Sequence, residues 1–163
     1  MKFEASAPLG EVQAWLREQA AGDGARCPCC TQLTKVYRRS LNAGMARALI
    51  WMYRAAGTEW QKKTDTLRGI GAAARDEALL RYWGLLEERN GESGRRVGWW
   101  RVTEAGEAFV LGETRVPRHV LVFDGRCLGL DERAGTTSIF DALGDHFDYH
   151  VLMDSPAGVE PTG

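Results

Sequence analysis

The stretch that decides the fold is YWGLLEERNGESGRRVGWWRVTEAGEAFV, residues 82–110. It holds two segments typical of strands, LLEER at 85–89 and VGWWRV at 97–102, on either side of a turn cluster that opens with an Asn-Gly pair. Such a pair between two strand-like segments favours a β-hairpin. Thr103 then predicts the capped start of a helix over EAGEAFVL. We therefore expect a hairpin that leads directly into a helix.

Three helical segments precede this hairpin. Ser40 is a plausible N-cap for LNAGMARALIWMYRAAG at 41–57, whose apolar residues recur at helical spacing. Thr66–Ile70 predicts a short helix, and AAARDEALLRYW at 72–83 has good helix propensity and stops at Gly84. The order of elements is thus helix, short helix, helix, hairpin and helix.

The strand at 97–102 carries adjacent tryptophans, Trp99 and Trp100. Because successive side chains of a strand point to opposite faces, one of the two is expected in the core and the other on an outer surface. We favour a packing role for the outer tryptophan, as cover for a neighbouring helix.

The two ends of the chain add further elements. Leu9–Ala21 reads as an amphipathic helix. A second hairpin is predicted around Asp124-Gly125, and Ser138 with Asp141 resembles a capping box for a helix over IFDAL, which ends at Gly144. A last helical piece is expected at about 146–153.

The net charge of −1 conceals a basic middle and an acidic end. Residues 26–103 carry fifteen Lys and Arg against seven Asp and Glu, whereas residues 104–163 carry four against eleven. A basic region of this size suggests a polyanionic partner for the middle of the chain. The other interpretation is that the two regions attract each other within one fold.

The residues around the hairpin resemble winged helix-turn-helix regulators of the MarR and PadR types. YWGLLEE at 82–88 is similar to the end of a recognition helix and the "GLL" that leads into the wing. VTEAG at 102–106 is similar to the "LTxxG" helix start that follows the wing. The chain also looks similar to small, uncharacterised bacteriophage proteins that carry a CPxC knuckle ahead of such a domain. The resemblance to the MarR and PadR types covers roughly residues 41–111 and implies DNA binding, whereas the resemblance to phage proteins implies no known activity. We expect a transcription regulator or a phage-type accessory protein.

We therefore expect an α+β protein in four parts. An N-terminal helix and Cys knuckle occupy 1–39, and the winged helix-turn-helix occupies 40–112. A small β-hairpin and helix unit over 113–153 packs on it, and residues 154–163 form a disordered tail.

In a winged helix of this kind, the helix at 72–83 enters the major groove and the hairpin tip contacts the DNA backbone. The candidate DNA-binding residues are basic side chains of this helix, of the hairpin tip and of the segment before the helix. They are Arg75, Arg81, Arg95, Arg96, Lys62, Lys63 and Arg68. Two features weigh against base reading: Asp76 and Glu77 add negative charge to the helix, and it has no Asn or Gln to read an adenine edge.

The main alternative is a protein-docking adaptor that uses the same fold without DNA, because fold does not fix function. DNA binding requires the hairpin arginines, Lys62 and Lys63 to be exposed on one face. Docking allows them to be scattered or paired with acidic residues of the C-terminal unit. The partner surface would then be that acidic unit or the exposed tryptophan face. A homodimer is compatible with either function.

Several classes of protein are not expected. The sequence holds no P-loop, no G-x-G-x-x-G, no G-x-S-x-G and no H-E-x-x-H, so we predict a protein that is not an enzyme. It has no apolar run of 18 residues and no signal peptide pattern, and its clustered cysteines favour a reducing compartment. We predict a cytoplasmic protein.

The segment Cys27-Pro28-Cys29-Cys30 contains the C-x₂-C spacing of a zinc knuckle, in which Cys27 and Cys30 bind one metal. Structural zinc takes four ligands, and the chain has no second C-x₂-C. Candidates for the other two ligands are Cys127, His119, and the pair His146 and His150, whose spacing would put both rings on one helix face. We favour a degenerate, metal-free knuckle. The alternative is one structural zinc completed from far along the chain or from another chain.

Overall fold

The computed structural model describes residues 3–73 and 76–155 and has the expected α+β class. The chain divides into two compact units, which we call the knuckle unit and the helical unit. The knuckle unit comprises residues up to Arg39 together with Leu121–Gly129, and the helical unit comprises Ser40–Val120 together with the residues from Leu130 onward. The chain therefore passes from one unit to the other three times.

The knuckle unit begins with helix α1 (Leu9–Ala21), which has the predicted bounds. Trp15 packs edge-on against Phe3, with ring centroids 5.3 Å apart. After the helix, Gly24 takes a positive φ of 85°. A Cβ at this position would lie 2.9 Å from the carbonyl oxygen of Thr34, so the tight passage requires glycine. Strands β1 (Ala25–Arg26) and β2 (Leu33–Thr34) then pair antiparallel around the cysteines.

A second sheet has the order β3-β7-β8. Its strands are β3 (Tyr37–Ser40), β7 (Val116–Phe123) and β8 (Arg126–Thr137). The predicted turn between the last two is confirmed, because Asp124 and Gly125 have positive φ values of 49° and 69°, as a two-residue hairpin turn requires. β8 is longer than the segment that the sequence predicted.

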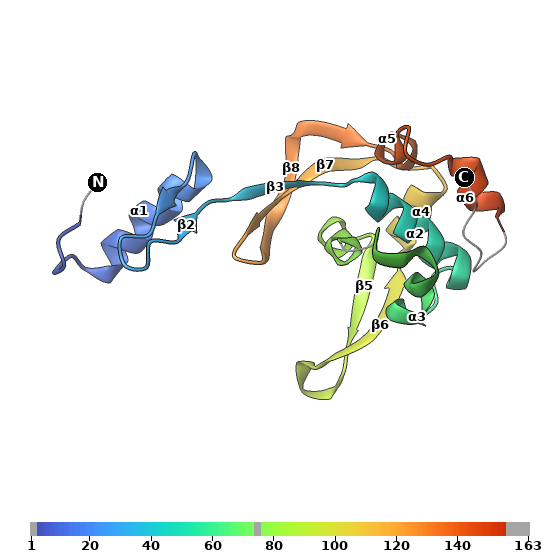
Figure 1. Ribbon diagram of the computed structural model, residues 1–163, viewed down its shortest axis with the longest axis horizontal. Helices are drawn as coiled ribbons and strands as arrows, with labels where there is room; N and C mark the ends of the chain where they lie inside the picture. Colours follow the sequence, from blue (N-terminus) through green and yellow to red (C-terminus); the bar gives the residue numbers. More distant parts are fainter. Residues whose placement is uncertain (1–2, 74–75, 156–163) are drawn as a thin grey trace. The chain divides into compact units, whose positions relative to one another are not determined.

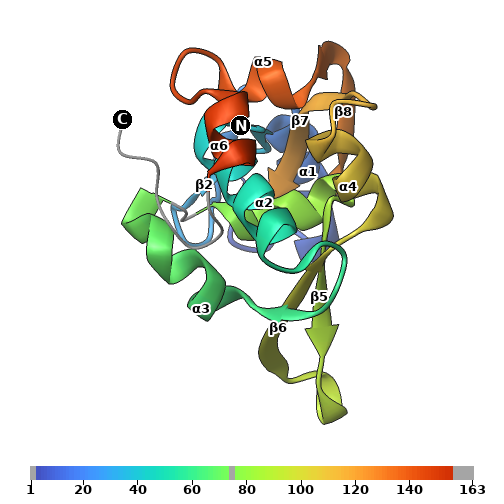
Figure 2. The same ribbon diagram turned by 90° about the vertical axis from the view of Figure 1, so that its right-hand side faces the viewer.

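In the helical unit, α2 (Ala43–Ala56) is the central element (Figure 2). Apolar side chains make up most of its buried residues, and Met45, Leu49 and Met52 are at most 2% exposed. It contacts the helices that surround it: α3 (Lys63–Leu67), α4 (Glu104–Val110), α5 (Ile139–Leu143) and α6 (Tyr149–Asp154). The helix begins after Asn42, whose side chain accepts the backbone N–H of Met45, rather than after Ser40. This burial of apolar area forms the core of the unit.

A three-stranded sheet completes this core, with the order β4-β6-β5. Its strands are β4 (Gln61–Lys62), β5 (Leu86–Asn90) and β6 (Arg96–Val102). Trp100 lies opposite Gln61 on one side and Glu88 on the other, and it is buried. Trp99 is half-buried on the other face of the sheet, which confirms the prediction that the two tryptophans separate.

The hairpin of β5 and β6 leads into α4 as predicted. Thr103 caps this helix: its hydroxyl accepts the backbone N–H of Gly106 and donates to the carbonyl of Gly84. Gly106 packs directly on the strand, because a Cβ there would lie 2.2 Å from the carbonyl oxygen of Leu85. The VTEAG segment thus fixes the angle between helix and hairpin.

The helix predicted at 72–83 differs in the structure. Two short 3₁₀ segments take its place, η1 (Arg68–Ala73) and η2 (Glu77–Trp83), and residues 74 and 75 lie outside the described residues. Asp76 has φ −104° and ψ 5°, outside the α region, so the second segment starts anew. Gly84, with φ 72°, ends it as predicted.

The last two helices follow different signals. The capping box at α5 is confirmed, since the Ser138 and Asp141 side chains each accept the other's backbone N–H. α6 starts at Tyr149, later than predicted, because the side chain of Asp148 caps it by accepting the backbone N–H of Val151.

Most of the predicted tail, residues 156–163, lies outside the described residues. Within the described ranges, no helix has the length and apolar character needed to cross a membrane.

Candidate functional site

The hairpin of β5 and β6 extends away from the helices of its unit (Figure 1). Its connection is a 3₁₀ turn over Glu92–Gly94, closed by a backbone hydrogen bond from Gly91 to Arg95 at 2.9 Å. A Cβ on Gly91 would lie 2.6 Å from the Val97 side chain, so the base of the turn is tightly packed. A packed base holds the tip as a defined surface rather than a loose loop.

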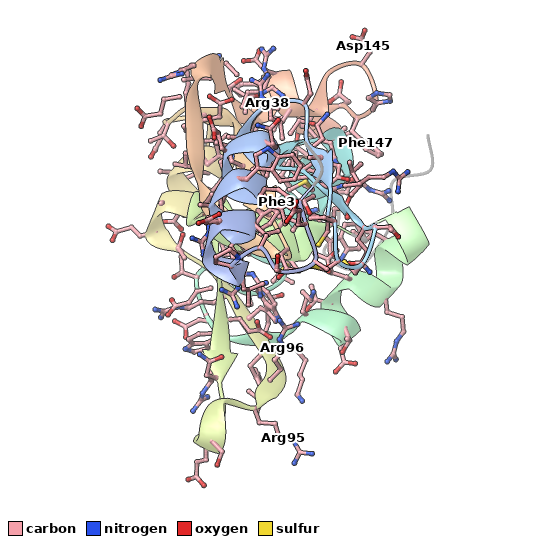
Figure 3. All side chains as sticks on the ribbon, turned by 90° about the vertical axis from the view of Figure 1, so that its left-hand side faces the viewer. Phe3, Arg38, Arg95, Arg96, Asp145 and Phe147 are labelled. Atoms are coloured by element: carbon pink, nitrogen blue, oxygen red, sulfur yellow. The ribbon has the colours of Figure 1, made fainter. Side chains whose placement is uncertain are left out.

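The two arginines at the tip, Arg95 and Arg96, are exposed. Figure 3 shows Arg95 at the end of the hairpin, with its side chain directed away from the strands. Within the described residues, neither side chain has a hydrogen bond or an ion pair. Both guanidinium groups are therefore available to an anionic ligand, and their planar donor arrays suit phosphate.

One face of the sheet carries alternating aromatic and cationic side chains, here called the outer face: Trp60, Lys62, Trp99 and Arg101. Lys62 lies opposite Trp99 in the register, and its ammonium is 5.4 Å from the indole centroid. The guanidinium of Arg101 lies 4.7 Å from the Trp60 centroid and pairs with Glu87 at 2.7 Å. Trp99, the outer tryptophan, thus lies against the ammonium of Lys62.

Lys63 was predicted to contact DNA and expected to be exposed, and the structure shows its side chain half-buried. Its ammonium lies 2.6 Å from Oε1 of Glu77 and 4.6 Å from the Trp100 ring centroid. The side chains of Lys63 and Glu77 are only 17% and 7% exposed. This ion pair joins the start of α3 to the start of η2, so Lys63 acts inside the fold.

The other three predicted basic residues differ in their surroundings. Arg81 is half-buried and lies 3.3 Å from Glu88, so it braces η2 against β5. Arg68 is 80% exposed, with Asp65 at 3.2 Å, and such surface pairs are weak. Arg75 lies outside the described residues. Of the seven predicted DNA-binding residues, the structure therefore brings Arg95, Arg96 and Lys62 together on the hairpin and its sheet.

The cysteine turn belongs to the knuckle unit. Backbone N–H groups of Cys30 and Cys29 hydrogen-bond to the Cys27 sulfur and lower the pKa of that thiol. The charge of Cys27 in turn raises the pKa of Cys29. The turn therefore favours a thiolate at its first cysteine.

The candidate third and fourth metal ligands lie on β7, on β8 and at or just before α6. Within residues 3–73 and 76–155, no group of three or more His, Cys, Asp or Glu side chains is placed to hold a metal ion. His146 precedes α6 and His150 lies inside it, so the helix face expected to carry both rings is not formed. Cys127 is half-buried in β8, and His119 is half-buried in β7.

Three residues of the outer face and the hairpin were not predicted to lie at the candidate site: Trp60, Arg89 and Arg101. Strand alternation could have found Arg101, because it lies two residues from Trp99 on the same strand. Arg89 is exposed on β5. Trp60 precedes β4, which has only two residues and therefore leaves no alternating pattern to read.

Comparison of the chain with protein-family models, with curated proteins and with solved structures finds no match.

Proposed function

We propose that this chain binds duplex DNA as a winged helix-turn-helix protein, with the β5–β6 hairpin as its wing. The order of elements supports this: α2, β4, α3, the two 3₁₀ segments, β5, β6 and α4, with the sheet order β4-β6-β5. The observation that carries the proposal is the pair of exposed arginines at the hairpin tip, which have no acidic partner among the described residues.

The charges of the hairpin favour phosphate contacts over base reading. Arg101 and Arg81 are paired with Glu87 and Glu88, whereas the tip arginines, Arg89 and Lys62 are exposed cations of the hairpin and its sheet with no acidic partner among the described residues. The segment that would read bases is the weaker part, since η2 is short and its Arg81 is already engaged. We therefore expect affinity that depends strongly on salt and little on DNA sequence.

The test is fluorescence anisotropy of a random duplex across a salt series from about 50 to 200 mM. Each phosphate contact contributes about 0.9 to the slope of log affinity against log salt, so Arg95→Ala/Arg96→Ala should reduce the slope by about 2. The control is Arg17→Ala/Arg126→Ala, which removes the same charge from exposed positions outside the hairpin. An unchanged slope in the wing variant, or no binding by the parent chain at low salt, would contradict the proposal.

A protein-docking adaptor is the second candidate function. The observation in its favour is that Lys63 and Arg81 are engaged by Glu77 and Glu88, although these acids lie outside the C-terminal unit. The anisotropy experiment separates the two functions, because an adaptor has no reason to bind duplex DNA even at low salt.

A further inference from the structure

The cysteine turn is a rigid local structure. Its ends are held by a backbone hydrogen bond from Cys27 to Gln32 at 2.8 Å and another from Thr31 to Cys27 at 2.8 Å. Thr31 takes a positive φ of 63°, and the guanidinium of Arg26 donates to its carbonyl at 2.9 Å. The turn therefore keeps Cys27 and Cys30 in a fixed relation instead of letting them move as loop residues.

The two thiols are also accessible. Cys30 is exposed and Cys27 is half-buried, and both are free cysteines. They line one hollow together with Leu33 and Tyr37 of the same unit. A ligand that approaches this hollow reaches both sulfurs without any rearrangement of the turn.

Two large apolar side chains are exposed at this hollow, whose lining also includes the polar residues Gln32, Lys35 and Asp124. The side chains of Leu33 and Tyr37 are each 52% exposed, and both border the cysteine pair. An apolar patch beside a pair of thiols fits a surface that becomes covered when a partner docks. The patch and the thiols are contiguous, so one partner would cover both.

We propose that the CPCC turn is half of a metal site shared by two copies of this chain, in which Cys27 and Cys30 of each copy bind one soft divalent cation such as Zn²⁺. Zinc prefers four ligands in a tetrahedron, and thiolates are its strongest protein ligands. Two copies related by a two-fold axis supply four thiolates from the single C-x₂-C motif of the sequence. The same axis brings Leu33 and Tyr37 of one copy against the equivalent residues of the other.

The experiment uses the full chain, stripped of metal and kept reduced with a phosphine. Zn²⁺ is titrated while the mass is followed by sedimentation velocity, and Co²⁺ is titrated while thiolate-to-metal charge-transfer absorption is recorded. We expect the mass to double from 18.1 kDa with one cation per two chains. Cys27→Ser and Cys30→Ser should each abolish both signals.

Matched controls lie in the same unit. Cys29→Ser removes a neighbouring thiol of the same turn, and Cys127→Ser removes the fourth cysteine, so both should leave dimer and stoichiometry unchanged. Leu33→Glu places a charge in the expected interface and should weaken zinc-dependent dimerisation at least about tenfold.

Four results would overturn the proposal. Absence of binding shows that the turn holds no metal, and one cation per monomer shows that the same chain completes the site. A dimer that forms in the reduced chain before any metal is added shows that the cation is not what joins the copies. Equal dimerisation by Leu33→Glu and the parent shows that the apolar patch lies outside the contact.

Discussion

The ion pair of Lys63 and Glu77 gives the sharpest test of the fold, because Lys63 was predicted to contact DNA and lies in a half-buried pair. The ammonium and the carboxylate lie 2.6 Å apart, and Glu77 is nearly inaccessible to solvent. Removing one member of such a pair leaves a buried charge without its partner, which typically costs about 3–5 kcal/mol. Replacing both members by apolar side chains of similar volume removes that penalty.

Burial sets the size of each effect. Lys63→Met leaves the carboxylate of Glu77, the more buried group, and we expect a loss of about 3 kcal/mol. Glu77→Leu leaves an ammonium that retains some exposure and the face of Trp100, so a loss of about 2 kcal/mol is expected. The double variant should lose about 1 kcal/mol, less than either single variant, because no buried charge remains; this is a coupling of about 4 kcal/mol.

The assay is urea unfolding followed by the fluorescence of the six tryptophans, with the midpoint compared at an unchanged m-value. A loss below about 0.5 kcal/mol for Lys63→Met, with additive effects in the double variant, would refute the buried pair. The double variant also tests DNA binding. Its salt slope should equal that of the parent, and a slope smaller by about 1 would mean that Lys63 contacts phosphate.

Two further predictions concern single positions. Gly106→Ala should cost about 3 kcal/mol by urea unfolding, because the new Cβ would lie 2.2 Å from a backbone carbonyl oxygen, whereas Gly10→Ala, with open space around it, should cost nothing. The backbone N–H of Ser138, and then Arg115, lower the pKa of Asp141, so its carboxylate stabilises the fold above the ordinary pKa of about 3.9 and loses this effect as pH falls through the folded value. Asp141→Asn should therefore lower Tm at pH 7, and the difference from the parent should disappear on acidification; a difference that persists at low pH would contradict this cause.

Elements that depend on a few neighbouring residues could be predicted from the sequence. Asp124-Gly125, Thr103 and the Ser138 capping box each specify a turn or a helix start through their own backbone. Helix α1 has the predicted bounds because proline precedes it and glycine follows it. In these places the local hydrogen bonds decide the conformation, and tertiary contacts do not oppose it.

Elements that depend on distant partners could not be predicted in this way. Residues 72–83 have good helix propensity, yet the pairing of Glu77 with Lys63 and of Arg81 with Glu88 holds shorter 3₁₀ turns. Helix propensity is only a small energetic preference, so tertiary contacts of this kind can override it. β4 could not be predicted from the sequence either, because its two residues form a strand only by pairing with β6.

The candidate site shows the same division. The exposed arginines at the tip follow from the hairpin signal alone, since a turn between two strands lies at the surface. The half-buried position of Lys63 has no signal in the sequence, because its partner lies fourteen residues away and the contact needs both η2 and α3 in place. The sequence therefore shows how many basic residues this region has, but the packing of the fold decides which of them are exposed to a ligand.

The three passages of the chain between its units have a consequence for fragments of this protein. Residues up to Arg39 form one compact unit with Leu121–Gly129, although more than eighty residues separate the two segments along the chain. A single cut after Arg39 would release a knuckle peptide. The other segment of its unit, Leu121–Gly129, would remain part of the larger fragment. The cut protein is thus a natural candidate for complementation, in which a separately supplied peptide can be exchanged for a labelled or redesigned one.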